Sequence, residues 1–202
     1  MKTLIEKAGI DTKKTKKIAQ FIDFLLVKNS ELNLISRKLE VNTILLEHIY
    51  DCLAGFNYFK GYKSITDLGS GGGFPGLLLG IVFSESTIHL VEKSPKKAKY
   101  LYDAVNHLKL TNVTVNNGLV NEFIVKTDVI TCRGFKPINE IIDMTQLYFN
   151  SDVTYILFKG RVETINEELG LTAKKYSIHS EIFKIADQMP EKERNIVILK
   201  KS

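Results

Sequence analysis

The sequence of 202 residues has no tryptophan and only two cysteines, Cys52 and Cys132, which lie far apart in the chain. Neither belongs to a Cys-x-x-Cys pair. This scarcity argues against a disulfide framework and against a cysteine-based zinc site. It favours a protein that works in a reducing compartment.

Long hydrophobic runs are also missing. The longest, Leu77 to Phe83, is far shorter than the ~20 residues that a helix needs to cross a bilayer. Residues 1–7 alternate charged and apolar side chains and lack the apolar centre of a signal peptide. We therefore expect a cytoplasmic protein with no membrane contact.

Charge of one sign is only slightly in excess, with a formal net charge of +5. Residues 1–63 hold most of it, because they carry 11 Lys and Arg against 7 Asp and Glu. A modest basic excess suits a polyanionic partner such as RNA, although proteins without such a partner also show it. The length suits one compact unit, in which we expect an N-terminal helical extension (1–63) and a main domain (64–202).

The N-terminal region has the periodicity of helices. Apolar side chains fall on one helical face over residues 12–28, at Ile18, Phe21, Ile22, Leu25 and Leu26. Four lysines occupy the opening turns of this helix, where they form either a solvated surface or an RNA-facing patch: Lys13, Lys14, Lys16 and Lys17. A second helix is predicted over residues 42–59.

From residue 64 onward, strands alternate with helices. Strands are predicted at 65–68, 87–92, 112–115, 128–132 and 153–158, and helices at 77–82, 95–109, 137–148 and 163–169. This alternation is typical of an α/β fold with a parallel sheet covered on both faces. Two alternating stretches, 174–184 and 194–200, predict an antiparallel hairpin that closes the sheet.

The most informative segment is the glycine loop, residues 67–76 (Asp-Leu-Gly-Ser-Gly-Gly-Gly-Phe-Pro-Gly), between the first strand and its helix. Glycines at such a turn allow positive φ angles and let a ligand approach the backbone closely. Gly71, Gly73 and Gly76 match the dinucleotide fingerprint, and Glu92 lies where an acid would bind a ribose. A dinucleotide site, in an enzyme or in a regulatory module, therefore remains an alternative.

Asp67 favours a different cofactor. A carboxylate at the end of the strand would repel a pyrophosphate, but it can accept a hydrogen bond from a cationic amine or from the loop itself. S-adenosylmethionine has no phosphate and carries a sulfonium and an ammonium group, and Glu92 would accept both of its ribose hydroxyls. The pattern thus favours an S-adenosylmethionine-dependent methyltransferase over an NAD-binding protein.

Short motifs across nearly the whole chain resemble the RsmG (GidB) family of small-subunit ribosomal RNA methyltransferases. Besides the glycine loop with its Phe-Pro-Gly ending, these motifs are Asn33–Ser36, His48–Asp51, Lys96-Lys97, Cys132–Phe135, Leu157–Gly160 and Arg194–Ile198. The resemblance implies a class I Rossmann-like methyltransferase, with a seven-stranded, mostly parallel sheet, one antiparallel C-terminal strand and preceding N-terminal helices. It also implies methylation of N7 of a guanine in 16S rRNA, in a loop near the decoding site.

The resemblance also implies roles for individual residues. Gly69 and Phe74 would line the cofactor, Val120 and Asn121 would flank its adenine, and Arg133 would reach the cofactor or the target base. With Asp67, Gly71 and Glu92 these residues make up the expected cofactor site. Two positions depart from the family pattern, because Leu119 stands where Arg is usual and Glu47 where a basic residue is common.

The chemistry expected for this family needs no general base, because guanine N7 has an in-plane lone pair and carries no proton. Arg133 is the candidate catalytic residue, acting by positioning. Cys132 offers an alternative, since methylation of a pyrimidine C5 uses a thiolate, but a small buried strand residue is the simpler interpretation. We interpret His48 and Asp51 as a structural hydrogen-bonded pair, and Phe135 as a ring that stacks on the target base or packs in the core.

The substrate side should be basic. We expect five residues to contact 16S rRNA, alone or within an assembling small ribosomal subunit: Lys96, Lys97, Lys159, Arg161 and Arg194. Each is also a plausible solvated surface charge. No metal is expected, and we expect the protein to act as a monomer.

Overall fold

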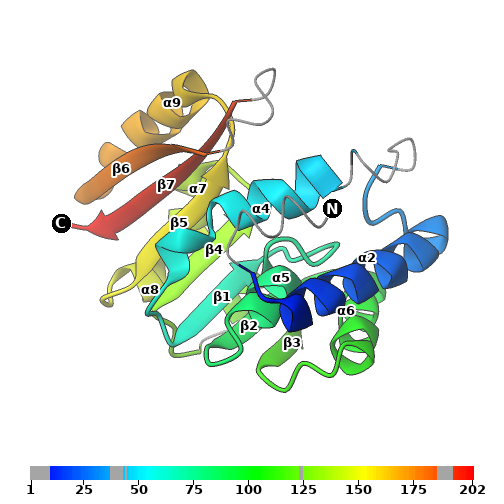
Figure 1. The fold of residues 1–202 in the computed structure, drawn as a ribbon. Helices are drawn as coiled ribbons and strands as arrows, with labels where there is room; N and C mark the ends of the chain where they lie inside the picture. Colours follow the sequence, from blue (N-terminus) through cyan, green and yellow to red (C-terminus); the bar gives the residue numbers. More distant parts are fainter. Residues whose placement is uncertain (1–9, 37–42, 44, 123–124, 186–192) are drawn as a thin grey trace.

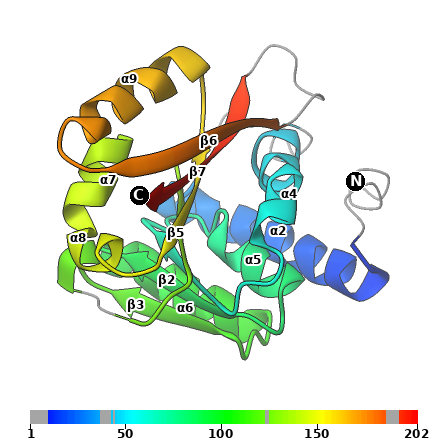
Figure 2. The same cartoon turned by 90° about the vertical axis from the view of Figure 1, so that its left-hand side faces the viewer.

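The computed structural model describes residues 10–36, 43, 45–122, 125–185 and 193–202 (Figure 1). Within these ranges, no helix is both long and apolar enough to cross a membrane. A central sheet separates two groups of helices (Figure 2). Each face of the sheet has its own cluster of buried apolar side chains. This is the layered α/β arrangement predicted from the alternation of strands and helices.

The sheet has seven strands in the order β3-β2-β1-β4-β5-β7-β6. Strands β1 to β5 pair in parallel, whereas β7 pairs antiparallel with both β5 and β6. The predicted mostly parallel sheet with one antiparallel C-terminal strand is therefore confirmed. The strands are β1 (Ser64–Leu68), β2 (Thr87–Glu92), β3 (Val113–Asn117), β4 (Val129–Arg133), β5 (Thr154–Lys159), β6 (Ile178–Ile185) and β7 (Arg194–Lys201).

The helices on one face of the sheet come from the first half of the chain. They are α2 (Thr12–Leu32), the π-helix η1 (Leu45–Tyr50), α4 (Asp51–Ala54), the 3₁₀ helix η2 (Phe56–Phe59), α5 (Gly76–Val82) and α6 (Pro95–His107). The opposite face carries α7 (Ile138–Met144), α8 (Gln146–Phe149) and α9 (Val162–Ala173). A short 3₁₀ helix, η3 (Val120–Glu122), follows β3.

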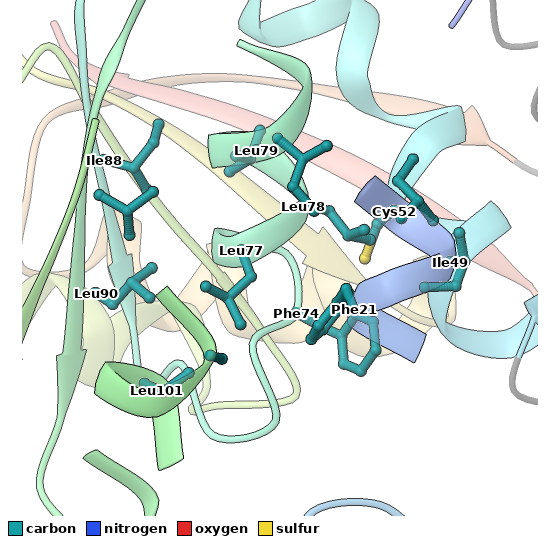
Figure 3. Close-up of a cluster of buried hydrophobic side chains, with 14 of the residues drawn as sticks. Phe21, Ile49, Cys52, Phe74, Leu77, Leu78, Leu79, Ile88, Leu90 and Leu101 are labelled. Carbon is teal, nitrogen blue, oxygen red and sulfur yellow. The ribbon is translucent and has the colours of Figure 1, made fainter. Parts of the chain in front are cut away.

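Helix α2 forms as the periodicity predicted and extends to Leu32. Asp11 caps its start by accepting a hydrogen bond from the backbone N–H of Lys14 at 2.9 Å, and Asn33 ends it in a left-handed conformation. The buried face of the helix packs against α5 and α6. There Phe21 meets Phe74 of the glycine loop, close to Cys52 and Leu77 (Figure 3). The N-terminal helices therefore share one core with the sheet.

The second predicted helix is not regular. Residue 43 is helical, residues 42 and 44 lie outside the described residues, and the segment from Leu45 to Phe59 changes from π to α to 3₁₀ geometry. The break after α4 falls at Gly55, where a Cβ atom would press into the rings and methyl groups of Phe158 and Ile196. The predicted helix is therefore confirmed as a helical segment but not as one regular helix, and Gly55 lets that segment pack closely against the sheet.

The predicted helix over residues 137–148 is likewise divided, into α7 and α8. Thr145 lies at the break with φ of −112°. Its hydroxyl donates to the carbonyl of Ile141 at 2.6 Å and also meets the Tyr155 hydroxyl at 2.8 Å. A side chain that bonds its own backbone in this way competes with regular helix.

The first five strands lie within two residues of their predicted boundaries.

Candidate functional site

The glycine loop connects the carboxyl end of β1 to the start of α5. Gly73 has φ of 92°, which side chains rarely adopt, and a Cβ atom there would collide with Leu77. Gly69 has φ of 67°, and its bare Cα lies directly against the ring of Phe135 from the segment after β4. The structure therefore requires glycine at Gly69 and Gly73, because both have a positive φ angle and neither leaves room for a side chain.

Asp67 lies beneath this loop and is fully buried. Its Oδ2 atom accepts a hydrogen bond from the Gly76 N–H, the first residue of α5, at 3.1 Å. Among the described residues, Oδ1 has no hydrogen-bond partner. Burial raises the pKa of Asp67 from 3.8 to about 7, although the neighbouring Ser70 side chain and the Gly76 N–H oppose this shift. The sequence predicted two possible partners for Asp67, the loop and a cofactor amine. The structure shows the bond to the loop, and contact with a cofactor amine stays a prediction.

Glu92 ends β2 and joins the loop to the next helix. Its Oε2 atom accepts from the Gly71 N–H at 2.9 Å, and its Oε1 atom accepts from the Ser94 N–H at 2.8 Å. Ser94 caps α6, as predicted, by accepting from the backbone N–H of Lys97. The carboxylate thus holds the glycine loop against the start of α6. Each oxygen keeps a further lone pair, so ribose binding by Glu92 stays a prediction.

Phe74 is only 8% exposed. Its ring centroid lies 5.3 Å from that of Phe21 and 5.1 Å from that of His48, and the guanidinium of Arg133 lies 5.8 Å from its face. This cation–π arrangement ties the glycine loop to the end of β4. The N-terminal helices therefore cover Phe74, which the sequence placed simply beside the cofactor.

Val120 and Asn121 lie in η3, just beyond β3. The Gly118 N–H and the Asn117 side-chain amide both donate to the carbonyl of Glu92, at 3.2 and 2.9 Å. This brings η3 to the same end of the sheet as the glycine loop. Val120 is buried, whereas Asn121 is exposed, so only the second has a freely accessible side chain.

Arg133, the last residue of β4, is the centre of a group of contacts that the sequence did not predict. Its Nη1 atom donates to the carbonyl of His48 at 3.2 Å and to Sγ of Cys52 at 3.4 Å, and it lies 3.5 Å from Oδ2 of Asp51. Its Nη2 atom contacts Nδ1 of the His48 ring. His48 and Asp51 each bind Arg133, so their interpretation as a pair bonded to each other gives way to a shared role around this guanidinium.

A cleft of about 470 Å³ opens beside Arg133, between the ends of β4 and β5 and the start of β7. Its charged lining residues are four basic and two acidic: Arg133, Lys136, Lys159, Arg194, Asp51 and Glu168. Phe135 also lines it, at the side nearest Gly69. The carboxyl ends of parallel strands form the binding crevice in sheets of this kind, and the cleft lies there.

The predicted RNA-binding residues fall into two groups. Lys159 and Arg194 line the cleft, and Arg161 is exposed just beyond β5 at the start of α9. Lys96 is exposed and Lys97 half-buried at the start of α6, beyond Glu92. The two groups therefore flank the glycine loop on opposite sides.

The ammonium group of Lys159 already has partners on the protein. It lies 2.7 Å from Oε2 of Glu168 and donates to the carbonyl of Lys136 at 2.7 Å. The same Glu168 oxygen accepts from the Ile138 N–H at 2.9 Å. Lys159 thereby joins β5, α9 and the start of α7, so an RNA phosphate would have to share it with Glu168.

Cys132 is buried in β4, and burial raises the pKa of its thiol to about 12. A thiol in this environment stays protonated near neutral pH and is a poor nucleophile. This observation favours the interpretation of Cys132 as a packed strand residue over that of a base-attacking thiolate.

Comparison with known proteins agrees with the motif pattern. A family model described as GidB, rRNA small subunit methyltransferase G, matches residues 14–197. The chain is 34% identical over 181 residues to ribosomal RNA small subunit methyltransferase G 1 of Bdellovibrio bacteriovorus, covering 89% of this chain and 87% of that protein. It is 34% identical over 193 residues to ribosomal RNA small subunit methyltransferase G of Brachyspira hyodysenteriae, covering 94% and 92%.

Solved structures with the same fold are more distant in sequence. An O-methyltransferase from Bacillus cereus in complex with SAH aligns with a TM-score of 0.62 at 15% identity, covering 90% of each chain. Precorrin-6y C5,15-methyltransferase from Geobacter metallireducens aligns with a TM-score of 0.57 at 15% identity, covering 83% of this chain and 92% of that one. At such identities the likeness establishes the fold alone.

Proposed function

The chain belongs to the rRNA small subunit methyltransferase G family, and we propose that it transfers a methyl group from S-adenosylmethionine to N7 of a guanine in 16S rRNA. The resemblance seen in the sequence motifs is thus confirmed at the level of the family. The observation that carries the proposal is the family match over residues 14–197, which spans the glycine loop, both of its carboxylates and Arg133.

The described residues fit this cofactor. The glycine loop offers bare backbone at Gly71 and Gly72, and both residues remain partly accessible. Two carboxylates, Asp67 and Glu92, lie beneath and beside the loop, which suits a cationic ligand better than a pyrophosphate. We assign cofactor binding to eight residues: Asp67, Gly69, Gly71, Phe74, Glu92, Val120, Asn121 and Arg133. The cofactor, when bound, supplies an electrophilic methyl group on a sulfonium.

The protein's own task is orientation. Guanine N7 attacks directly, so the site needs no group to remove a proton. Holding the base in line with the methyl group can contribute about 7–11 kcal/mol. The position of Arg133, between the Phe74 ring and the cleft, suits a residue that fixes this alignment.

The RNA would lie along the basic residues on both sides of the loop. We propose that Lys96 and Lys97 contact phosphates on one side, and Lys159, Arg161 and Arg194 on the other. We further propose that residues 1–63 act as a helical extension of the domain 64–202, and that the protein works as a cytoplasmic monomer on rRNA or an assembling small subunit.

Borohydride reduction and aniline cleavage of 16S rRNA test the function, because this treatment breaks the chain at N7-methylguanine. Cells with the gene should yield one break that is absent after its deletion and returns on complementation. Identical patterns would refute the N7 assignment. Calorimetric titration with S-adenosylmethionine and with NAD distinguishes the methyltransferase from a nucleotide-binding regulatory module, since only the first should bind S-adenosylmethionine preferentially.

A further inference from the structure

Two arginines from separate strands meet one carboxylate from the N-terminal helices. Oδ2 of Asp51 lies 3.5 Å from Nη1 of Arg133 and 3.4 Å from Nε of Arg194. The Asp51 side chain is 3% exposed, against 18% for Arg133 and 28% for Arg194. The carboxylate therefore lies behind the two guanidiniums, which lie between it and solvent.

We propose that Asp51 is a positioning residue for methyl transfer, which holds Arg133 toward the glycine loop and Arg194 toward the cleft. This inference rests on the proposed function. It gives the helix after the π-helix a role in the site, because Asp51 is the first residue of α4.

The sheet alone would not hold the two arginines together. Arg133 pairs with Phe158 of β5, and Phe158 pairs in turn with Ile196 of β7, so a whole strand separates the arginine-bearing strands. Neighbouring strands lie about 4.8 Å apart, which leaves the arginine backbones roughly two strand spacings from one another. Asp51 spans this gap from the helical layer above the strand ends.

Charge explains why the carboxylate matters. Two guanidiniums that share a wall of a cleft repel each other, and partial burial strengthens the repulsion. The negative charge of Asp51 offsets it, and the Glu47 carboxylate adds a second negative charge that acts on Arg133. Without the charge of Asp51, Arg133 would keep its bonds to His48 but lose its ionic partner, and Arg194 would turn toward solvent or toward another acceptor.

The two arginines have different neighbours and so serve different ends of the site. Arg133 is also fixed by the His48 carbonyl and lies over the Phe74 ring. Arg194 donates from Nη1 to the Glu193 carbonyl at 3.1 Å and lines the cleft beside Asn195. A guanidinium has five N–H donors, so Arg194 retains several for an RNA phosphate or a base edge while Asp51 fixes its Nε side.

A double-mutant cycle tests the inference. Methyl transfer from labelled S-adenosylmethionine to small ribosomal subunits from a deletion strain would be measured for Asp51→Asn, Arg194→Gln and the double variant. We expect kcat/KM to fall on the order of 100-fold for Asp51→Asn and roughly 10-fold for Arg194→Gln. The double variant should be no worse than Asp51→Asn alone, because Asp51 acts partly through Arg194.

Controls separate positioning from folding. Asp143→Asn removes another ion-paired carboxylate, which lies 2.9 Å from Lys175 in an exposed pair, and should keep the wild-type rate. Melting temperatures would show that each variant is folded at the assay temperature. If Asp51→Asn does not fold, Arg194→Lys replaces it, because lysine keeps the charge but loses the Nε–H that faces Asp51.

The outcomes are distinct. Multiplicative losses in the double variant, or a wild-type rate for Asp51→Asn or Arg194→Lys, would overturn the role of Asp51 and leave the proposed function intact. A wild-type protein that methylates no small-subunit RNA would instead reject the proposed function.

Discussion

Replacing Asp67 by asparagine should stabilise the cofactor-free protein, and increasingly so as the pH rises. The side chain is fully buried, one of its oxygens has no hydrogen-bond partner among the described residues, and the other accepts from the Gly76 N–H. A charged carboxylate in such a place is costly. Asparagine has nearly the same shape and can still accept the bond from Gly76.

The size of the effect follows from proton linkage. The pKa of Asp67 rises from 3.8 in the unfolded chain to about 7 in the folded protein. The folded state therefore binds the proton more tightly, and Asp67 makes its largest contribution to stability below pH 3.8. That contribution is lost as the pH rises toward 7, by about 4 kcal/mol in all at 1.36 kcal/mol per pKa unit. Between pH 5 and pH 8 the loss is about 3 kcal/mol.

The assay compares the two proteins at both pH values. Thermal unfolding of wild type and Asp67→Asn would be followed without cofactor, and the difference in melting temperature between them recorded at pH 5 and at pH 8. For a domain of this size, 1 kcal/mol corresponds to about 2–4 °C, so the difference should shift in favour of the variant by about 6–12 °C. Because the difference at pH 5 is subtracted from the difference at pH 8, any effect of the amide on packing that does not depend on pH cancels.

Asp143→Asn provides the matched control, because Lys175 and Tyr176 lower the pKa of that exposed carboxylate. It stays ionised across this range in both folded and unfolded protein, so its difference from wild type should not vary with pH. If the difference in melting temperature between Asp67→Asn and wild type is also the same at pH 5 and pH 8, the pKa of Asp67 is near its ordinary value. The argument from burial would then be wrong.

Three further predictions concern the site. Cys132→Ser should keep most of the methylation activity, since the thiol is buried and protonated; complete loss with a trapped covalent RNA adduct would contradict this. Arg133→Ala should lower kcat/KM at least 100-fold, because orientation is lost, and an unchanged rate in the subunit assay would remove Arg133 from the site. Reversing Lys96 and Lys97 to Glu should weaken RNA binding and reduce the dependence of log affinity on log salt, and an unaltered slope in filter-binding titrations would exclude both from phosphate contact.

Much of the fold could be predicted because its strands are marked locally. The strand from Thr87 to Glu92 has its predicted boundaries, since a buried run ends at an acid and a capping serine follows. The antiparallel pairing of β6 and β7 was also predicted, from alternating side chains without an intervening helix. Such features depend on neighbours in sequence, and periodicity records them directly.

The segment from Leu45 to Phe59 could not be predicted in the same way. Its apolar spacing resembles that of an ordinary helix, and the close approach of Phe158 and Ile196 that leaves no room for a side chain at Gly55 comes from residues more than a hundred positions later in the chain. The same holds for Asp51. Nothing near it in sequence indicates that two arginines from β4 and β7 converge on its carboxylate, because that meeting depends on how the helical layer lies over the sheet.

The two acids of the glycine loop show why a motif can identify a site and still leave the action of its residues open. Asp67 and Glu92 were recognised by their positions at strand ends, and a cofactor was the obvious partner. In the structure, both carboxylates bind backbone N–H groups of the loop, at Gly76 and Gly71. A variant that loses these bonds would disturb the shape of the loop as well as any contact with ligand, so loss of activity alone does not separate the two roles. Stability measured without cofactor can, because contacts with the ligand do not contribute to it, whereas the bonds to the loop and the burial of the carboxylate do.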